Sequence, residues 1–297
     1  MYAITGITGQ VGGSVARALR ASGEKVRAVV RNKDKAQVFI ADGMAAAIAD
    51  FNNLDALTAA FTGVEGVFVM IPADFAPAPG FPEARAIIAT LKAALEIAHP
   101  PKLVVLSSVG AQHDQGLGLI TQLHLLEAAM NELSLPVTFV RPAWFMENAQ
   151  WDINPAQESG EIQSFLVPLD RPIPMVATED IGRVCAQSLL SSWQGKRVIQ
   201  LEGPQRYSPQ DLAHSLSVIL GRSVHAVEVE RARWTEIFEA GGMPHGRTDM
   251  RVEMLDGFNS GWIAFEQNIG DIVLGTLTLD KVIQQMVGNR ELSHSPA

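Results

Sequence analysis

The first 30 residues carry the feature that most constrains the fold, a row of glycines between a short apolar run and an amphipathic segment. Gly6, Gly9 and Gly12 are spaced three residues apart. Residues 2–5 before them form an apolar run that is typical of a strand buried on both faces. Residues 11–19 after them have apolar side chains at helical spacing. The pattern predicts a strand, a glycine turn and a helix that begins inside the glycine row.

Glycines in such a turn have a mechanical purpose in folds that bind dinucleotides. One allows the tight bend, one lets a pyrophosphate approach the backbone, and one lets the helix pack closely on the sheet. The phosphates then lie on the free N–H groups at the positive end of the helix dipole. The flanking strand and helix are the context in which this interpretation holds. The alternative is an ordinary tight turn that binds nothing.

The end of the next strand indicates which dinucleotide is bound. Residues 26–30 form a second apolar, β-branched run, and Arg31 follows where a fold that prefers NAD places an acid for the ribose hydroxyl. The Arg31 guanidinium and the Lys35 ammonium suit a 2′-phosphate. The sequence therefore predicts NADP(H) in preference to NAD(H). For Lys33, a solvated basic turn is a real alternative.

Composition excludes several classes of function. With 297 residues, 47% of them hydrophobic, the chain can build a large core and one and a half to two domains. A net charge of −9 argues against direct binding of nucleic acid. Cys185 is the single cysteine, which excludes an internal disulfide and favours a helix core position. No apolar run approaches the ~20 residues of a membrane span, and no signal peptide is recognisable, so we expect a cytoplasmic protein.

No metal site is expected either. None of the seven histidines lies three to five residues from another, and no cysteine joins them.

Helices and strands alternate after Arg31, which predicts an α/β fold with a doubly wound, mostly parallel Rossmann sheet. Strands are expected at 43–50, 66–71, 102–107 and 136–141, and helices at 35–41, 54–61, 82–98 and 119–132. The carboxyl ends of these strands should face the cofactor. Asp50 and Phe51 would then lie near the adenine, although Asp50 or Asn53 could equally cap the helix 54–61. Phe75, in the proline-rich loop 72–82, is a candidate for the pocket mouth or part of a stiff connection.

The composition changes after Asn148, which indicates a smaller interleaved α+β lobe. We expect residues 1–151 to form the Rossmann domain and 175–202 to return to it. Residues 152–174 and 203–297 would form the substrate-side lobe. Thr178 is expected to cap a helix to Leu190, Ser208 one to Leu220, and Thr278 a final helix to Val287. Apolar residues between 250 and 263 either wall a pocket or form the core of the lobe, namely Met250, Met254, Phe258 and Trp262.

Five segments together resemble the NmrA-like branch of the atypical short-chain dehydrogenases/reductases. They are GITGQVG, VVRNKDK, VVLSSVGA, TFVRPAWFMEN and PIPMVATEDIGRV, in this order over roughly the first 200 residues. That branch includes quinone oxidoreductase-like and triphenylmethane reductase-like enzymes, and also regulators that sense the cofactor.

The resemblance implies a role for individual residues. The pyrophosphate loop would be Gly6, Thr8, Gly9, Gln10, Val11 and Gly12. Arg31 and Lys35 would hold the 2′-phosphate, and Asp50 and Phe51 would flank the adenine. Ile71, Pro72 and Ala73 would lie along the ribose. The nicotinamide would be bordered by Ser107, Ser108, Pro142, Ala143, Trp144 and Phe145. Trp144 and Asn148 would join Phe75 in the substrate pocket.

The sequence lacks the tyrosine and lysine pair with which active members of the wider family relay a proton. Its only tyrosines, Tyr2 and Tyr207, are followed four positions later by Gly6 and Asp211. The helix where the pair should lie contains one histidine, His124. Its imidazole could donate a proton, or it could simply be packed among leucines.

Two functions remain compatible with these observations. The first is an NADPH-dependent reductase that transfers hydride to a quinone, an enone or a similar small conjugated or carbonyl acceptor without such a relay. The second is an NADP(H)-binding sensor that acts through a protein partner without turnover. The catalytic residue is not identified by the sequence in either case.

Overall fold

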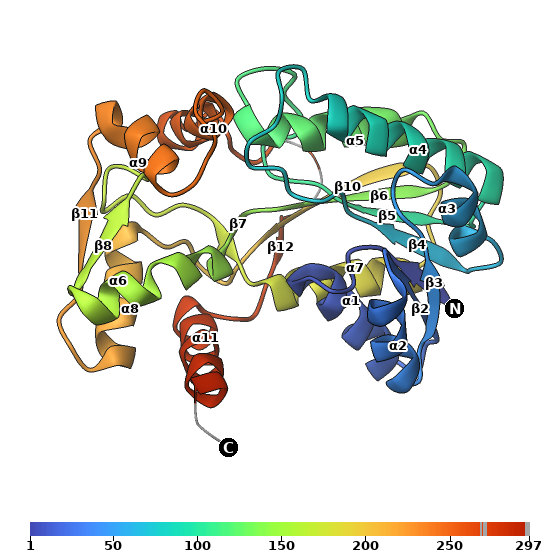
Figure 1. The fold of residues 1–297 in the computed structure, drawn as a ribbon, viewed down its shortest axis with the longest axis horizontal. Coiled ribbons are helices and arrows are strands. Elements are labelled where there is room, and N and C mark those ends of the chain that lie inside the picture. Colours follow the sequence, from blue (N-terminus) through green and yellow to red (C-terminus); the bar gives the residue numbers. More distant parts are fainter. Residues whose placement is uncertain (268, 270–271, 295–297) are drawn as a thin grey trace.

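A parallel eight-stranded sheet forms the centre of the computed structural model, which describes residues 1–267, 269 and 272–294 (Figure 1). The strand order is β12-β10-β6-β5-β4-β1-β2-β3, and every neighbouring pair is parallel. The strands are β1 Tyr2–Ile4, β2 Val26–Val30, β3 Ala45–Ile48, β4 Gly66–Val69, β5 Leu103–Leu106, β6 Val137–Pro142, β10 Lys196–Glu202 and β12 Ile272–Leu274. The predicted α/β Rossmann fold is confirmed.

The strand order reverses direction at β1. From β1 the chain proceeds outward to β2 and β3 on one side, and then to β4, β5 and β6 on the other. Every residue of β1, β4 and β5 is buried, as continuous apolar runs in a sheet covered on both faces require. Ligands of such sheets bind beyond the carboxyl ends of the strands at the reversal point. The fold therefore predicts a ligand site at the sheet edge beyond β1 and β4.

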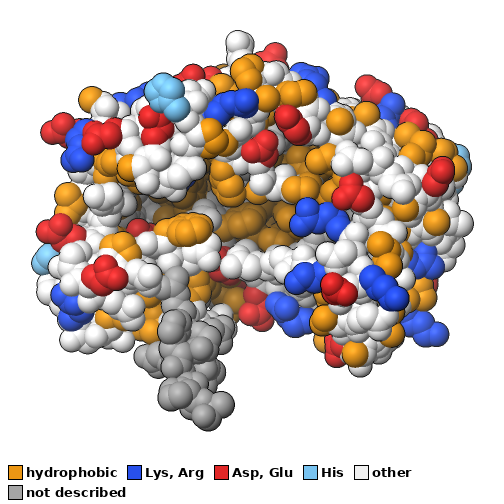
Figure 2. Space-filling model, in the orientation of Figure 1, with side chains coloured by type: hydrophobic (Ala, Val, Ile, Leu, Met, Phe, Trp, Pro, Cys, Tyr) orange, Lys and Arg blue, Asp and Glu red, His pale blue; other side chains and the backbone are white. Residues whose placement is uncertain are grey.

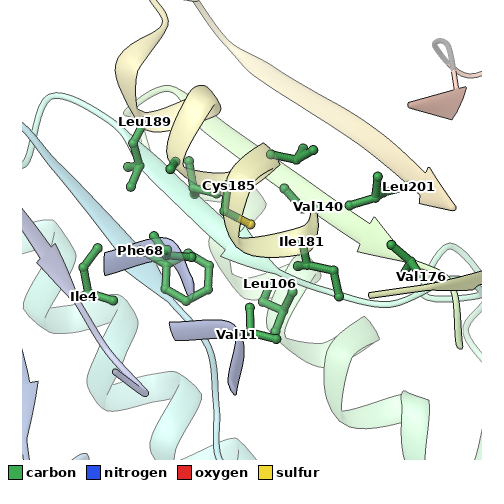
Figure 3. Close-up of a cluster of buried hydrophobic side chains, with 14 of the residues drawn as sticks. Ile4, Val11, Phe68, Leu106, Val140, Val176, Ile181, Cys185, Leu189 and Leu201 are labelled. Atoms are coloured by element: carbon green, nitrogen blue, oxygen red, sulfur yellow. The ribbon is translucent and has the colours of Figure 1, made fainter. Parts of the chain in front are cut away.

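Helices cover both faces of this sheet (Figure 1). On one face lie α3 (Leu54–Phe61), α4 (Pro82–Ala98) and α5 (Thr121–Asn131), and on the other lie α1 (Gln10–Ala21), α2 (Lys33–Ala41) and α7 (Thr178–Leu190). Figure 3 shows sheet residues such as Phe68 and Val140 against Ile181, Cys185 and Leu189 of α7. Cys185 is fully buried, as expected for a helix core residue, and burial raises the pKa of its thiol.

Close contact between α1 and α7 depends on Gly182. A Cβ atom added at this glycine would lie 2.3 Å from Cβ of Ser14. Helix α1, which begins within the glycine turn, thus packs closely on α7 from the second half of the chain.

The smaller lobe lies at the other end of the molecule (left in Figure 1). Its two-stranded parallel sheet pairs β8 (Glu161–Ser164) with β11 (His225–Glu228). The helices of this part are α6 Ile153–Glu158, α8 Pro209–Leu220, α9 Trp234–Ala240, α10 Asp249–Ser260 and α11 Leu279–His294. Short 3-10 turns occur at Gly118–Ile120, Met146–Trp151 and Arg231–Arg233. Two short strands at the junction, β7 (Trp144–Phe145) and β9 (Met175–Val176), also pair in parallel.

The structure corrects three details of the sequence analysis. Thr178 does not cap α7: it is the first helical residue, and its N–H and hydroxyl donate to Glu147 at 2.8 and 2.6 Å. The carboxylate needed at this helix start thus comes from a distant segment. The last helix continues to His294, beyond the predicted end at Val287. Strand β12 lies in a segment that the sequence analysis placed in the lobe, yet it extends the main sheet beside β10.

Other expectations agree with the structure. Strand β10, from the segment expected to return to the main sheet, pairs with β6. Ser208 caps α8 through a capping box with Asp211, and Pro209 occupies the first turn. Within the described residues, none of the helices has the length and hydropathy that crossing a membrane requires.

Candidate functional site

The carboxyl ends of six neighbouring strands bring most of the predicted site residues into one strip. Because the strands are parallel, their carboxyl ends meet at the same edge of the sheet. In spatial order from β3 to β6, the strip contains Asp50 and Phe51, Arg31, the turn Gly6–Gly12, Ile71–Ala73, Ser107 and Ser108, and Ala143–Phe145. Neighbouring strands lie about 4.8 Å apart, so the strip is roughly 24 Å long. Residues far apart in the sequence thus lie along one edge of the sheet.

Two glycines of the turn are required by the backbone itself. Gly6 has a φ of +62°, and a Cβ atom there would lie 2.5 Å from the sulfur of Met70. A Cβ atom at Gly12 would lie 2.3 Å from the carbonyl oxygen of Gly6. Gly9 differs, because its φ of −94° suits any residue and an added Cβ would meet only the Gly6 oxygen, at 3.3 Å. A side chain at position 9 would therefore require only a small backbone shift, much less than at positions 6 and 12.

The first turn of α1 offers free donors. Gly9 is the N-cap and supplies no side-chain acceptor, and the first turn contains no acidic residue. Among the described residues, no acceptor is found for the N–H groups of residues 10–12. The turn thus combines unpaired donors with the positive end of the helix dipole, which suits an anion.

Arg31 lies at the end of β2, just before α2. Asn32 caps this helix by accepting a hydrogen bond from the N–H of Lys35 at 3.0 Å, so α2 starts at Lys33, two residues earlier than predicted. The side chains of Arg31, Lys33 and Lys35 are exposed and form no ion pair with any described acid. Three cationic groups are therefore free beside the strip.

The structure decides which of Asp50 and Asn53 caps the helix 54–61. Asn53 caps α3 by accepting from the N–H of Ala56 at 3.0 Å. The exposed carboxylate of Asp50 instead accepts from the backbone and side chain of Asn52. Asp50 is thus not a helix cap, and its contact with adenine stays a prediction.

A cavity of about 460 Å³ opens where the carboxyl ends of β4, β5 and β6 meet the lobe. Figure 2 shows hydrophobic side chains in the hollow between these two parts. Ten of the predicted residues line it: Ile71, Pro72, Ala73, Phe75, Ser107, Ser108, Ala143, Trp144, Phe145 and Asn148. Pro142 does not, because it is buried in β6, where its carbonyl accepts from the N–H of Val109. The size and apolar walls are those of a small-molecule site.

Two exposed aromatic side chains are found among the lining residues. Phe75 is 61% exposed and Trp151, which the sequence analysis did not name, is 75% exposed. The loop that carries Phe75 is held to α5, because the side-chain amide of Gln122 donates to the carbonyl of Asp74 at 3.0 Å. Aromatic groups so exposed on a fixed loop and on the lobe are suited to a pocket entrance.

A buried polar network lies under the sheet edge of the cavity. The hydroxyl of Ser107 donates to the carboxylate of Glu127. Arg141 holds the same carboxylate with two hydrogen bonds of 2.8 and 2.7 Å and reaches Glu266 at 2.7 Å. Burial alone would lower the pKa of Arg141, but the two carboxylates raise it. The hydroxyl of Ser108 donates to the carbonyl of Val109 at 3.0 Å. Both serine hydroxyls at this edge therefore already donate to the protein.

His124 lies outside the cavity lining. Its Nδ1 atom is 3.0 Å from the carbonyl oxygen of Ala111, and because a carbonyl only accepts, Nδ1 carries the hydrogen. The neighbouring Gln122 and Leu123 line the cavity instead. The structure thus favours the packed histidine over the proton donor.

Neither tyrosine faces the cavity. Tyr2 is buried in β1, and the hydroxyl oxygen of Tyr207 accepts from the N–H of Leu279 at 3.1 Å.

Three charged residues that the sequence analysis did not name also line the cavity, Asp74, Asp152 and Arg251. Of the apolar residues named between 250 and 263, Met254 and Phe258 line it, whereas Trp262 stacks on His113 at 4.0 Å. Arg251 lies three and seven residues before these two, so helical spacing was the signal that could have found it. Asp152 has no such signal.

The carboxyl group of Asp152 should make the stability of the protein depend on pH. Burial raises its pKa from 3.8 to about 7. The folded protein therefore binds more protons than the unfolded chain between about pH 4 and about pH 7, and stability falls as pH rises through that window.

We expect Asp152→Asn to remove most of this fall. Across this window, the free energy of unfolding of the wild type should decrease by about 2 kcal/mol more than that of the variant. This value is smaller than the full pKa shift would give, because the side chain is partly exposed to solvent. Urea unfolding at several pH values measures the difference. The exposed Asp114→Asn is the control and should follow the wild type. Parallel profiles for wild type and Asp152→Asn would contradict the shift.

Comparison with known proteins places the chain in a family. The sequence profile of the NmrA-like family matches residues 2–260. The chain belongs to the NmrA-like family. The resemblance stated from five segments is confirmed, and it extends well beyond residue 200.

Curated relatives of this NmrA-like chain include two named reductases. It is 28% identical to the NAD(P)H azoreductase of Xenophilus azovorans over 255 residues, which cover 86% of each chain. It is 26% identical to quinone oxidoreductase 2 of Escherichia coli over 263 residues, which cover 88% of this chain and 89% of the relative.

Solved structures of two reductases share the architecture of this chain. The NADPH complex of the Escherichia coli NADPH-dependent quinone oxidoreductase has a TM-score of 0.80 at 24% identity, covering 97% of this chain and 100% of that one. The NADP(H) complex of Citrobacter sp. triphenylmethane reductase has a TM-score of 0.76 at 21% identity, covering 96% and 99%. At these identities the likeness shows the fold alone.

The described part of the chain contains no group of three or more histidine, cysteine, aspartate or glutamate side chains that could hold a metal ion.

Proposed function

We propose that this NmrA-like protein is an NADPH-dependent reductase that transfers hydride to a quinone, an enone or a similar conjugated acceptor. One observation carries the proposal: the glycine turn, with its unpaired N–H groups, and the apolar cavity lie along the same sheet edge, in the order in which a dinucleotide would connect them. The names of the two curated relatives, an azoreductase and a quinone oxidoreductase, support the same class of reaction.

The residues at the strip fit the cofactor. The free N–H groups at the start of α1 would hold the pyrophosphate, and the missing side chain at Gly9 would let it approach. Arg31 and Lys35 would hold the 2′-phosphate, because their side chains have no other partner among the described residues. Asp50 and Phe51 would flank the adenine, and Ile71–Ala73 the ribose. This set favours NADP(H) over NAD(H).

The chain's own contribution near the nicotinamide is positioning. Ser107, Ser108 and Ala143–Phe145 would border the ring, and the apolar walls would exclude water from the acceptor. Bound NADPH supplies the hydride, and a quinone that takes it with one proton from water becomes a hydroquinone. A quinone needs little proton assistance, which agrees with serine hydroxyls that already donate elsewhere and with the absence of a tyrosine from the cavity lining.

Steady-state oxidation of NADPH against a panel of acceptors tests this function. We expect menadione and 1,4-benzoquinone to be reduced, and a simple ketone such as cyclohexanone, which needs a strong general acid, to react far more slowly. Tight NADPH binding without reduction of any quinone or enone would contradict the proposal and favour a cofactor sensor that acts through a protein partner.

A further inference from the structure

Arg251 is the only cationic side chain among the described residues that line the cavity. It extends from α10 and is partly buried. Its guanidinium carbon lies 4.3 Å from the centre of the Phe238 ring, and Nη1 is 3.8 Å from the sulfur of Met243. A thioether is a weak acceptor, so the five N–H donors of the Arg251 guanidinium have one weak hydrogen-bond acceptor among the described residues.

Two other arginines of the lobe form short ion pairs. Arg231 is bound by Asp256 at 2.7 Å, and Arg206 by Glu202 at 2.9 Å. No described carboxylate lies within ion-pair distance of Arg251. Burial lowers the pKa of this guanidinium, which means that its charge is kept partly out of water with no negative group of the described residues beside it. An anion supplied by a ligand would provide such a group.

The helix sets the distance between this cation and the reacting end of the cavity. Arg251, Met254, Leu255 and Phe258 all line the cavity and follow helical spacing on one face of α10. The Phe258 ring packs edge-to-face on Trp144 at 5.1 Å, beside the expected nicotinamide position. Seven residues of helix separate Phe258 from Arg251, a rise of about 10 Å. The wall between them is apolar, formed by Met254 and Leu255.

We propose that Arg251 forms an anion subsite at the far end of the cavity, so that the acceptors used best are elongated aromatic compounds with a carboxylate or sulfonate about two rings from the reacting group. The inference rests on the proposed reductase function for its substrate class. The planar guanidinium can bind a carboxylate or sulfonate through two parallel hydrogen bonds, and Phe238 holds it in place.

Two acids share the cavity without contacting Arg251. The carboxylate of Asp74 accepts from the N–H of Ala76 at 3.0 Å, within its own loop. Asp152 is the second, and it is substantially protonated near neutral pH. Neither one supplies the missing partner.

A pair of unreactive ligands tests the subsite without relying on turnover. Calorimetry in the presence of NADP⁺ would compare biphenyl-4-carboxylate with the neutral biphenyl-4-carboxamide. We expect the wild type to bind the carboxylate about 10-fold more tightly. Arg251→Gln should remove this preference and Arg251→Lys should keep part of it, because a lysine retains the charge but not the paired donors. Arg206→Gln, an arginine outside the cavity lining, should keep all of it.

Equal affinities in the wild type, no binding of either ligand, or a preference that survives in Arg251→Gln would overturn the subsite. If Arg251→Gln does not fold, the wild-type comparison and Arg251→Lys still decide. A matched pair of acceptors extends the test: kcat/KM should be about 10-fold higher for the 4′-carboxylate of 2-phenyl-1,4-benzoquinone than for the parent compound. A wild type that prefers the carboxylate ligand but reduces no quinone would refute the reductase and leave the subsite intact.

Discussion

Replacing Gly9 with valine is expected to weaken NADPH binding by at least about 100-fold and to leave the thermal unfolding temperature within a few degrees of the wild type. The backbone at Gly9 suits a β-branched residue, and an added Cβ would contact only the Gly6 oxygen at 3.3 Å. The valine side chain would instead occupy the space above the first turn of α1, where the pyrophosphate would lie. Titration of NADPH fluorescence, together with thermal unfolding, measures both effects.

Gly12→Val is the matched comparison for this prediction. Its Cβ would lie 2.3 Å from a backbone oxygen and 2.9 Å from the backbone nitrogen of Ile7, so this variant should lose stability as well as binding. Retained NADPH affinity in Gly9→Val would mean that the turn does not hold the cofactor.

Arg31→Asp is expected to change the ratio of NADPH to NADH affinity by about 100-fold in favour of NADH. The substitution removes a charge-assisted contact to the 2′-phosphate and adds a carboxylate, which would repel the phosphate but can accept from a ribose hydroxyl. Arg31 is exposed and has no ion-pair partner among the described residues, so the fold should tolerate the change. Dissociation constants for both cofactors give the ratio directly.

A control variant with the same change of charge separates a direct contact with the 2′-phosphate from the effect of the protein's overall charge. Arg20, which pairs with Asp42 at 2.5 Å near the far end of α1, provides it as Arg20→Asp. This variant should leave the ratio unchanged within about two-fold, since exposed charges beyond the screening length interact weakly. An unaltered ratio in Arg31→Asp would remove the main argument for NADPH.

The sheet and its glycine turn could be predicted because their signals are local. Buried parallel strands are short apolar runs, and the positive φ at residue 6 requires a glycine, which is visible in the sequence. Once the strands were ordered, the rule for carboxyl ends placed Asp50, Arg31 and Ser107 along one edge. Local chemistry and a general topological rule were sufficient for this part.

The remainder depends on contacts between distant segments. Thr178 looked like a helix cap, but the acceptor for its N–H group is Glu147, 31 residues earlier. Strand β12 has three residues and forms only beside β10. Asp152 is an ordinary aspartate in sequence, and its raised pKa arises from a cavity built by several elements. No pattern within a short window reports these environments.

Anaerobic rapid mixing of the NADPH-loaded protein with menadione tests the central claim most directly. We predict that one hydroquinone forms for each NADPH oxidised. We also predict that deuterium at C4 of the nicotinamide slows the loss of absorbance at about 340 nm several-fold, because hydride transfer is the chemical step. Firm binding of NADPH, with no hydroquinone formed and no isotope effect, would contradict the assignment of this protein as a reductase.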